Sequence, residues 1–497
     1  MVIPTQAGDH ATWSESRNGC RAIKFPQTVG NHATRIVSVA GIRYVQVYDL
    51  GAGQAMPSQF DHDQHELELD WDTDAIVGRR NRYYAASQRA FVPYQQPLIF
   101  SKGQDQYLWD EKGNRYLDCL SQNLTISVGY NNPVVTRAVT RQAQTLQHCT
   151  TMFFHPMPAH YAEELTRTMP AGEEWVVHLM NSGAEAIDMA LLLARCYTGN
   201  IDTLSLTNSY HGATFGAQSV TGIGAFRHNV PLLGGIQFVP VPDPYRGIHG
   251  ACVEPYLDDL DASIHYATSG RLAGMLLEPI QGYGGIIPLP EGYISGALER
   301  VHAAGGLLIV DEVQSGMART GEHFWAFQKH AIVPDIVVAA KGLGNGYPLA
   351  AVIVKREIAE AMSSKFYFHT YGANPVNCAA GRAVLHVIEQ HMLQQRAREV
   401  GGALLAVLEE LQTRHPVIGA VRGRGMMMAI ELVKNRDSRE PDPETMLRLF
   451  EKTREFGLVA SKSGAYRNVL RICPPLCMQM DDVSFFADAI NKSFDSL

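Results

Sequence analysis

Two polar residues, Lys341 and Asp311, each follow or end a short apolar run that has the length of a buried strand. Lys341 comes after residues 336–340 in PDIVVAAKGLGNGYPLAAV, and Asp311 lies thirty positions earlier in LLIVDEVQSG. This separation fits one unit of strand, crossover helix and strand, so both side chains should emerge at the same sheet edge, where ligands bind. A lysine that can form a Schiff base and an aspartate that can hold a pyridinium nitrogen are the pair that pyridoxal phosphate (PLP) chemistry needs. Each residue alone would be read as a surface charge that ends a strand.

A second chemical signal lies in EWVVHLMNSGAEAIDMALLLARCYTGN. Residues 175–180 predict a strand, and a helix follows the tight turn and runs to Gly199. At the start of that helix, Ser182, Gly183 and Ala184 would offer backbone N–H groups, a hydroxyl and the positive end of the helix dipole. This arrangement suits a phosphate, although an ordinary serine N-cap is the simpler alternative.

Further polar or aromatic residues follow predicted strands. The strand predicted in DTLSLTNSYHG ends in Tyr210 and His211, which places an aromatic ring where it could stack on a flat heterocycle. Another strand, at residues 275–277, ends in the carboxylate of Glu278. With Asp311 and Lys341, three successive strands then end in polar residues, which is typical of an α/β active-site edge.

Composition narrows the class of protein. The chain has 497 residues, 46% hydrophobic and 19% charged, which predicts a large core divided into two or three structural units. Its formal charge of −8 is spread without basic clusters, which argues against nucleic acid or an anionic membrane as a partner. No apolar run is long enough to span a bilayer. The first twenty residues lack the features of a secretion signal or a transit peptide, so we expect a cytoplasmic protein.

Neither cysteines nor histidines indicate a metal site. The eight cysteines form no CxxC pair and are expected to be reduced core thiols. His62 and His65 lie in the acidic stretch FDHDQHELELDWDTD, but their spacing fits no standard ligand pattern, and charge runs are usually solvated. We therefore expect no bound metal.

The remaining segments suggest the domain organisation. Residues 29–53 suggest short strands, 97–120 a small antiparallel meander, 133–147 an amphipathic helix, and the tail from about residue 380 alternating helices and strands.

The motifs NSGAEAID, SYHGATFG, EPIQG, IVDEVQSGMARTG, AAKGLGNGYPLAAV and FHTYGANPV together resemble the class III (ω-type) PLP-dependent aminotransferases of fold type I. Within that class, TMFFHP and VRGRGMMMAIEL are most similar to the alanine–glyoxylate aminotransferase 2-like branch. The resemblance implies a large domain with a mostly parallel central sheet flanked by helices, and a smaller α+β domain built from N- and C-terminal segments. We expect an N-terminal extension of unknown role at 1–85, the first part of the small domain at 86–150, the PLP-binding domain at 151–378 and the rest of the small domain at 379–497.

The resemblance also assigns roles residue by residue. It makes Lys341 the Schiff-base lysine and Asp311 the partner of the pyridinium N–H, as the residues themselves suggested. It places Glu278 behind Asp311. The other implied cofactor contacts are the phosphate group of residues Ser182, Gly183 and Ala184, the ring-stacking Tyr210 with His211 adjacent, Gln314 near the ring hydroxyl, and Thr370, whose phosphate contact is donated by the other subunit of a homodimer.

Substrate specificity depends on two further positions. Arg471 matches the arginine that binds the substrate carboxylate, a role that suits its planar pair of donors, although alone it would be read as a solvated side chain. Ornithine and 4-aminobutyrate aminotransferases have a glutamate after EPIQG that can cover this arginine, and here the position is Tyr283. We therefore expect a 2-amino acid, a β-amino acid or a hydrophobic amine as donor, and pyruvate or glyoxylate as acceptor, in a ping-pong reaction.

Two other functions stay open at this point. The same residues serve decarboxylation-dependent transamination and phospho-amine elimination in other class III enzymes. The chain could also be a non-catalytic PLP-fold scaffold, although a scaffold has no reason to keep both Lys341 and Asp311.

Overall fold

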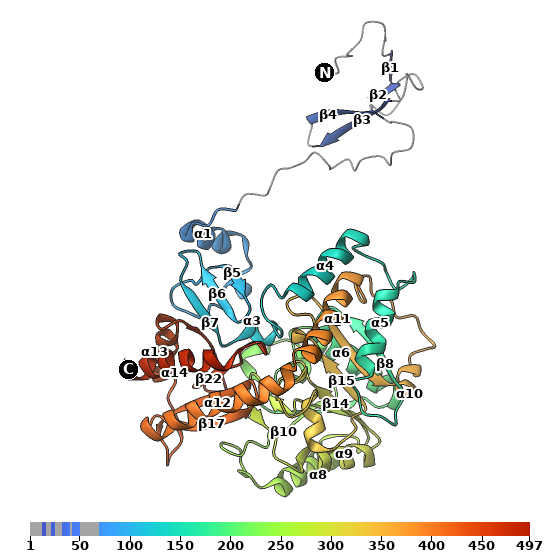
Figure 1. The fold of residues 1–497 in the computed structure, drawn as a ribbon. Coiled ribbons are helices and arrows are strands. Elements are labelled where there is room, and N and C mark those ends of the chain that lie inside the picture. The colour runs from blue at the N-terminus through green and yellow to red at the C-terminus, as the bar shows by residue number, and fades with distance from the viewer. Residues whose placement is uncertain (1–11, 16–20, 25–31, 40–41, 50–68) are drawn as a thin grey trace. The chain divides into compact units, whose positions relative to one another are not determined.

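The computed structural model describes residues 12–15, 21–24, 32–39, 42–49 and 69–497, and the chain divides into two compact units, Met1–Asp70 and Trp71–Leu497. The first unit contains two antiparallel strand pairs, as Figure 1 shows by its ribbons. The paired strands are β1 (Thr12–Glu15) with β2 (Arg21–Lys24), and β3 (His32–Val39) with β4 (Ile42–Asp49). The short strands predicted at residues 29–53 are confirmed, whereas His62 and His65 lie outside the described residues.

A seven-stranded sheet forms the centre of the second unit. Its strands follow one another in the order β10 (Ile236–Val239), β9 (Asp202–Leu206), β11 (Leu272–Leu277), β14 (Leu307–Asp311), β15 (Ile336–Ala339), β16 (Ala350–Lys355) and β8 (Trp175–Met180). Every neighbouring pair is parallel except the two that involve β16. The predicted mostly parallel sheet is confirmed.

Helices cover both faces of this sheet, because successive side chains of a strand point to opposite sides. In β14, Leu308 and Val310 join a core cluster shared with helices α8 (Val253–Ala267) and α9 (Tyr293–Ala303). Ile309 of the same strand joins the cluster that contains α6 (Gly183–Thr198). In a strand that is buried on both faces, apolar side chains do not alternate with polar ones. This explains the continuous apolar runs in the sequence.

Segments from the two ends of the second unit share a smaller sheet. Strands β5 (Phe100–Gln104), β6 (Tyr107–Asp110) and β7 (Arg115–Asp118) form the predicted antiparallel meander, and β20 (Leu458–Val459) pairs with β7 in parallel. Figure 1 shows β7 beside the C-terminal elements drawn in red. The predicted α+β part built from N- and C-terminal segments is therefore confirmed.

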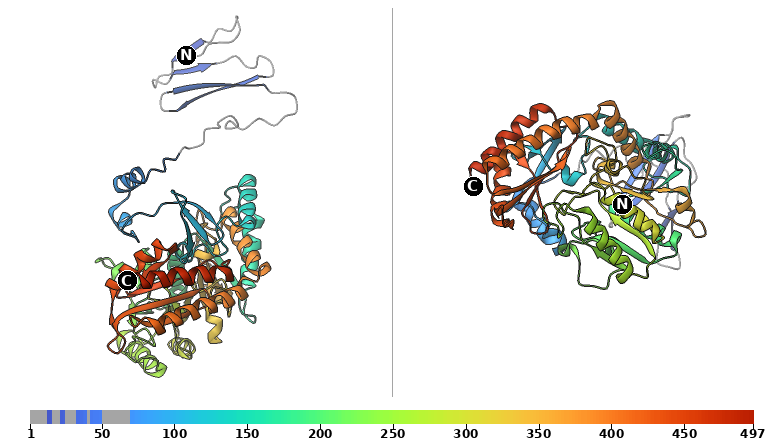
Figure 2. Two further views of the ribbon diagram at one scale, coloured as in Figure 1. Left: turned by 60° about the vertical axis from the view of Figure 1, so that its left-hand side comes forward. Right: turned by 90° about the horizontal axis from the view of Figure 1, so that it is seen from below.

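The C-terminal segment adds another antiparallel sheet and three helices. The sheet consists of β17 (Ile418–Arg424), β18 (Met427–Asn435), β22 (Val469–Ile472) and β21 (Ser461–Ser463), with β19 (Glu440–Pro441) beside β18. Helices α12 (Leu393–Arg414) and α14 (Met480–Asp495) pack against each other, as the two views in Figure 2 show, and α13 (Pro443–Glu455) packs on α14. The alternating helices and strands predicted after residue 380 are confirmed.

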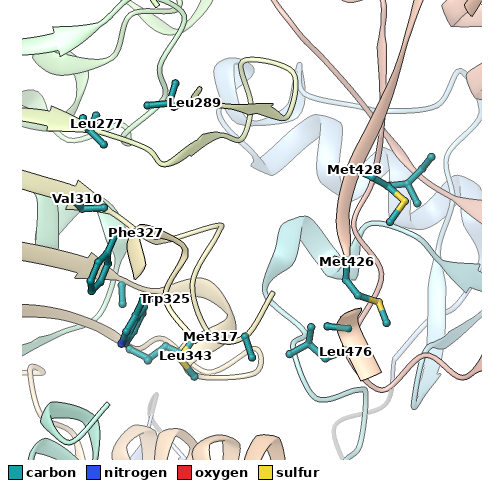
Figure 3. Packing of buried hydrophobic residues seen from close by; sticks show 14 of the residues in the cluster. Leu277, Leu289, Val310, Met317, Trp325, Phe327, Leu343, Met426, Met428 and Leu476 are labelled. Atoms are coloured by element: carbon teal, nitrogen blue, oxygen red, sulfur yellow. The ribbon is translucent and has the colours of Figure 1, made fainter. Parts of the chain in front are cut away.

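One hydrophobic core connects the central sheet to the C-terminal sheet. Figure 3 shows Val310 and Leu277 from the central strands with Trp325, and Met426 and Met428 from the C-terminal segment, all members of the same buried cluster. Continuous packing of this kind holds the two sheets in a fixed relation. Residues at the ends of β14 and β22 can therefore belong to one site.

The remaining helices and strands connect these layers. They are α1 (Thr73–Tyr83), α2 (Ala86–Arg89), α3 (Ser121–Leu124), α4 (Pro133–Thr145), α5 (Pro156–Thr166), α7 (Phe215–Val220), η1 (Gly224–Phe226), β12 (Ile280–Gln281), β13 (Ile287–Pro288), η2 (Ala326–His330), η3 (Lys341–Leu343), α10 (Arg356–Glu360) and α11 (Pro375–Gln390). None of the helices in the described part of the chain has the length and apolar character needed to cross a membrane. Helix α4 corresponds to the predicted amphipathic helix at 133–147.

The cysteines differ from one another in burial. Those in the described part of the chain carry free thiols. Cys119, Cys378 and Cys473 are buried, as predicted for core thiols, whereas Cys196 and Cys252 are exposed. The prediction of core thiols is thus wrong for these last two, because they lie at surface positions of α6 and just before α8.

Candidate active site

Three neighbouring parallel strands end in the polar residues that the sequence singled out. Glu278 follows β11, Asp311 is the last residue of β14, and Lys341 comes two positions after β15. The strands are adjacent in the sheet and parallel, so their carboxyl ends meet at one edge. Lys341 has a φ of +47°, in the left-handed region that non-glycine residues adopt rarely and often at functional sites.

The Asp311 carboxylate is oriented by two contacts. One oxygen, Oδ2, lies 2.7 Å from Nδ1 of His211, and the other accepts a hydrogen bond from the backbone N–H of Val313 at 3.0 Å. Both Asp311 and His211 are buried. The other ring nitrogen of His211, Nε2, is buried and has no hydrogen-bond partner among the described residues. The sequence placed His211 only next to the ring, and its bond to Asp311 could not be read from residues a hundred positions apart.

Glu278 sits behind Asp311 and ties two loops together. Its carboxylate accepts hydrogen bonds from the backbone N–H groups of Tyr210 at 3.1 Å and Gly282 at 2.8 Å. Burial raises the pKa of Glu278 to about 7, and the negative charge of Asp311 adds to that rise while His211 opposes it. The group therefore changes protonation close to neutral pH.

The amine of Lys341 has an environment that favours its neutral form. Burial lowers the pKa of Lys341 to about 8, although the charge of Asp311 works in the opposite direction and Arg471 adds to the fall. An amine with a pKa near 8 is partly unprotonated at neutral pH and can act as a nucleophile or a base.

Helix α6 points its N-terminus at the same space. Ser182 is its N-cap, and a capping box links the Ser182 hydroxyl to the N–H of Glu185, and the Glu185 carboxylate to the N–H of Ser182. The simpler reading of Ser182 as an N-cap is thus correct. The next two amides, of Gly183 and Ala184, belong to the first turn and have no intrahelical acceptor, so they remain as donors for an anion.

These groups line one cavity of about 410 Å³. It is bordered by Ser182, Gly183, Ala184, Tyr210, His211, Glu278, Asp311, Gln314 and Lys341 from the predicted set, and by Thr125, Val313 and Tyr347, which the sequence reasoning did not single out. The cavity wall requires glycine at position 212, where φ is +136° and a Cβ would lie 2.6 Å from that of Ala184.

Tyr210 belongs to a group of three aromatic rings. Its ring centroid lies 4.8 Å from that of Phe226 and 5.9 Å from that of Tyr283, while Phe226 and Tyr283 are 4.9 Å apart. Tyr210 itself is on a loop, because β9 ends at Leu206 instead of continuing to the residues that precede Gly212 as predicted. The turn formed by Asn208, whose φ is +64°, ends the strand. Nothing in the sequence pattern pointed to Phe226.

Arg471 lies in the middle of β22 with 1% of its surface exposed. Its Nη2 donates a hydrogen bond to Oε1 of Gln314 at 3.0 Å, and its guanidinium carbon is 5.8 Å from the centroid of the Tyr283 ring. Gln314 and Arg471 are 157 positions apart. Arg471 therefore contacts a residue that borders the cavity, and Tyr283 lies next to Arg471.

Three predicted site residues do not border this cavity: Tyr283, Arg471, which is hydrogen-bonded to the lining residue Gln314, and Thr370. Thr370 is exposed, on the segment between α10 and α11, and does not border the cavity of its own chain. The neighbouring aromatic residues Phe366, Phe368 and Tyr371 are exposed as well.

The residues of the cavity fit PLP. The free amides at the start of α6 and the Ser182 hydroxyl match a phosphate, Asp311 matches a protonated ring nitrogen, and Lys341 borders the same cavity. No group of three His, Cys, Asp or Glu side chains that could hold a metal ion occurs among the described residues.

Comparisons with known sequences agree with this geometry. The family model described as "Aminotransferase class-III" matches residues 90–494. Over 424 residues the chain is 42% identical to alanine–glyoxylate aminotransferase 2 homolog 2, mitochondrial, of Arabidopsis thaliana, covering 85% of this chain and 88% of that protein. It is 36% identical over 424 residues to the human alanine–glyoxylate aminotransferase 2, mitochondrial, covering 80% and 82%.

Solved structures with the same fold are enzymes of related chemistry. An aminotransferase from Bacillus anthracis has a TM-score of 0.80 at 30% identity, covering 86% of this chain and 99% of that one. A PLP-bound amine transaminase from an uncultivated Pseudomonas species has a TM-score of 0.76 at 30% identity, covering 83% and 96%. An Arthrobacter phospholyase in complex with phosphoethanolamine has a TM-score of 0.78 at 33% identity, covering 85% and 100%.

Proposed function

Because the chain belongs to the class III aminotransferase family and is therefore a PLP-dependent transaminase, we propose that it moves the amino group of a 2-amino acid to pyruvate or glyoxylate. The acceptors are suggested by the names of its relatives, two of which are alanine–glyoxylate aminotransferases. The donor class is suggested by Arg471, which offers a carboxylate two parallel donors. Tyr283 stands where ornithine and 4-aminobutyrate aminotransferases have the glutamate that can cover this arginine.

The roles of Lys341 and Asp311 follow from their positions at the sheet edge. When bound, PLP supplies an aldehyde that bonds an amine and a ring that takes up the electron pair released at the substrate's α-carbon. Lys341 is the residue that would hold the aldehyde carbon, and its Nζ would remove the proton from the substrate's α-carbon and deliver it to the former aldehyde carbon, a 1,3-proton shift. Asp311 would keep the ring nitrogen protonated, because a carboxylate stabilises the positive charge there.

Two other residues position this pair. His211 would hold Asp311 in one orientation through the 2.7 Å contact, and Glu278 would hold the loops of Tyr210 and Gly282 against the cavity. The Tyr210 ring would then stack on the cofactor, and Ser182, Gly183 and Ala184 would hold its phosphate.

The single observation that carries this proposal is the meeting of Glu278, Asp311 and Lys341 at the ends of three adjacent strands, with Arg471 hydrogen-bonded to Gln314 of the same cavity. The test is to follow the cofactor absorbance of the holoenzyme in the two half-reactions separately. L-Alanine should convert the cofactor to its amine form, and glyoxylate or pyruvate should restore the starting spectrum. A panel of β-amino acids and hydrophobic amines would replace alanine as the proposed donor if one of them reacted much faster.

We also propose a homodimer in which each chain supplies Thr370 to the phosphate of the other. The support is the exposure of aromatic side chains around that residue, at Phe366 and Phe368, and on the segment with Phe153 and Phe154. Clusters of exposed aromatic residues mark surfaces that bind other proteins. Mixing an inactive Lys341→Ala chain with an inactive chain changed at position 370 should produce hybrid dimers with one complete site. If subunit exchange occurs and no activity returns, Thr370 does not act across an interface.

A phospho-amine lyase is the second candidate reaction. It is favoured by the 33% identity to the Arthrobacter phospholyase over 85% of the chain. Incubation of the holoenzyme with phosphoethanolamine would release inorganic phosphate in that case, whereas a transaminase would leave the phosphate ester intact.

The compartment and the domain boundaries are further proposals. We propose a cytoplasmic location, whereas the names of the two relatives carry the word mitochondrial. Imaging the full chain with a C-terminal tag would decide between the two compartments.

We also propose domain boundaries near residues 85, 150 and 378. Limited proteolysis should cut the chain first near residue 85.

A further inference from the structure

Arg471 is a buried cation whose nearest hydrogen-bonding partner is uncharged. Only 1% of its surface is exposed, and among the residues that the structure describes no carboxylate lies within ion-pair distance of it. Its Nη2 is held by the amide oxygen of Gln314, and its Nε is buried without a hydrogen-bond partner. Buried charges are normally paired, so the missing anion here indicates a place where a ligand supplies it.

The amide of Gln314 is held in position from two sides. On one side Oε1 accepts the hydrogen bond from Arg471. On the other side the amide lies against Gly282, where an added Cβ would come within 2.4 Å of the Gln314 amide atoms. Gly282 is itself fixed, because its N–H donates to Glu278 at 2.8 Å. The side chain is 8% exposed and borders the cofactor cavity, so it lies between the cavity and Arg471.

The charge at position 314 decides whether Arg471 is open to a ligand. An amide oxygen orients the guanidinium but leaves its charge uncompensated, whereas a carboxylate at 3.0 Å would form an ion pair and compete with any substrate acid. The face of Arg471 toward Tyr283 carries no acid either, since the aromatic ring lies 5.8 Å away. The two side chains that these contacts identify beside the guanidinium, Gln314 and Tyr283, are therefore not acids.

We propose that Gln314 is a specificity-determining residue that orients Arg471 while keeping it uncovered, so that the site favours substrates with a carboxylate next to the reacting carbon. This inference rests on the proposed function, because it takes Arg471 as the carboxylate-binding residue. It adds a role for Gln314 besides contact with the ring hydroxyl.

The experiment measures carboxylate binding without turnover. Propionate, which has neither an amino nor a keto group, is titrated into PLP-loaded parent, Gln314→Glu, Gln314→Met and Gln144→Glu proteins by calorimetry. Gln314→Glu should weaken propionate binding about tenfold or more, since a charge-assisted contact is lost to competition. Gln314→Met should weaken it by only about threefold, because the charge of Arg471 stays open. Gln144→Glu adds the same charge at an exposed site on α4 and should have no effect.

A second readout separates specificity from damage to the site. In Gln314→Glu the single-turnover rate should fall at least about tenfold more with L-alanine than with 1-phenylethylamine, a donor without a carboxylate, because any loss through the cofactor contact of Gln314 affects both donors. Unchanged propionate binding in Gln314→Glu would overturn the inference, as would an equal loss of rate with L-alanine and with 1-phenylethylamine. If Gln314→Glu does not retain PLP, the test rests on Gln314→Met. A tenfold loss of propionate binding in Gln314→Met would contradict the claim that an uncharged side chain at position 314 is what keeps Arg471 open.

The result also distinguishes the two proposals. If the parent binds propionate and responds to Gln314→Glu but transfers no amino group from alanine to pyruvate or glyoxylate, the proposed substrates are wrong and the inference stands. If transfer occurs and Gln314→Glu binds propionate normally, only the inference fails.

Discussion

At the carboxyl edge of the central sheet, the pKa of Lys341 is lowered to about 8 and that of Glu278 is raised to about 7. At the amino edge of the same strands, the shifts run the other way. There the 2.9 Å ion pair with Asp335 raises the pKa of Lys355, and the pKa of Asp335 is lowered by its contacts with His302, with the N–H of Leu308 and with Lys355. At the carboxyl edge the pKa values of a lysine and an acid are thus shifted toward neutral pH. At the amino edge the pKa values of a lysine and an acid are shifted away from neutral pH.

The two edges differ in how many ion-pair and hydrogen-bond partners their charged groups have. Asp335 precedes β15 and is satisfied by Lys355, by His302 at 2.7 Å and by the N–H of Leu308 at 2.8 Å. Lys341 follows the same strand, and no carboxylate among the described residues forms an ion pair with it. Burial without a partner disfavours the charged form, whereas burial with partners favours it.

The comparison shows how one sheet can serve stability and chemistry at opposite edges. Groups with compensated charge stay ionised and contribute to folding, while groups with uncompensated charge become reactive near neutral pH. Substitutions at the carboxyl edge should therefore act on activity, and substitutions at the amino edge on stability.

The largest effect is expected from Lys341→Ala. Loss of both the cofactor attachment and the proton-transferring amine should reduce turnover by about four orders of magnitude or more. The free energy of unfolding should not fall, because a buried amine without a partner costs stability. Turnover and urea unfolding are measured on the same protein. Normal turnover would remove the proposed role, and strong destabilisation would break the comparison between the two edges.

Asp311→Asn should have the next largest effect. An amide cannot stabilise a protonated ring nitrogen as a carboxylate does, so the rate should fall by about three orders of magnitude, or ~4 kcal/mol in the activation barrier. PLP binding should persist, as measured by the cofactor spectrum. A loss below about tenfold would show that another group holds the nitrogen.

Asp335→Asn tests the amino edge. Removing the charge leaves Lys355 without its buried carboxylate, so the free energy of unfolding should fall by about 3 kcal/mol while turnover at low temperature stays near normal. Asp488→Asn is the matched control, since its ion pair with Lys492 is exposed and should contribute little. Equal stability of the two variants would contradict the structural role of the amino edge.

The smallest effect is a difference in pH dependence at Glu278. The folded chain holds this proton more tightly than the unfolded chain, since burial raises the pKa from 4.5 to about 7. Stability should therefore decrease as the pH rises, by about 2 kcal/mol between about pH 5 and about pH 7. In cofactor-free Glu278→Gln protein this part of the slope should be absent. Urea unfolding at several pH values measures it, and an unchanged slope would place the titrating group elsewhere.

At the amino edge the two contributions are lost outside the neutral pH range. The lowered pKa of Asp335 means that its contribution is complete above the ordinary pKa of an aspartate and is lost as the pH falls through the folded value, in the acid range. The raised pKa of Lys355 means that its contribution is present below the ordinary pKa of a lysine and is lost at alkaline pH.

Much of the fold could be predicted because buried parallel strands give short apolar runs that end abruptly. The run before Lys341 and the run ending at Asp311 are strands β15 and β14, and Gly199 ends α6 with a φ of +68°, as its position suggested. The extent of β9 was not predictable, since TNSYHG contains residues common in both strands and turns. A loop was expected from residue 121 because the stretch is rich in turn-forming residues, but its four consecutive positive φ values at 121–124, without a glycine, were not predictable.

The site residues at the strand ends could be predicted from the sequence, whereas the contacts between residues far apart in the chain could not. Lys341, Asp311 and Glu278 share one pattern, a polar residue after an apolar run, and the parallel sheet brings them together. The contacts of His211 with Asp311 and of Gln314 with Arg471 join residues 100 and 157 positions apart, which no local pattern specifies. Thr370 depends on a second chain, so its role stays a prediction.

The most direct test of the central claim is to locate the lysine that holds the cofactor. Reduction of the holoenzyme with sodium borohydride makes a bond between PLP and a lysine irreversible, and digestion followed by mass spectrometry identifies the modified residue. The positions of Lys341, Asp311 and Glu278 at one sheet edge predict that Lys341 alone carries the added phosphopyridoxyl mass. Modification of another lysine, or of none, would contradict the assignment of this edge as the active site.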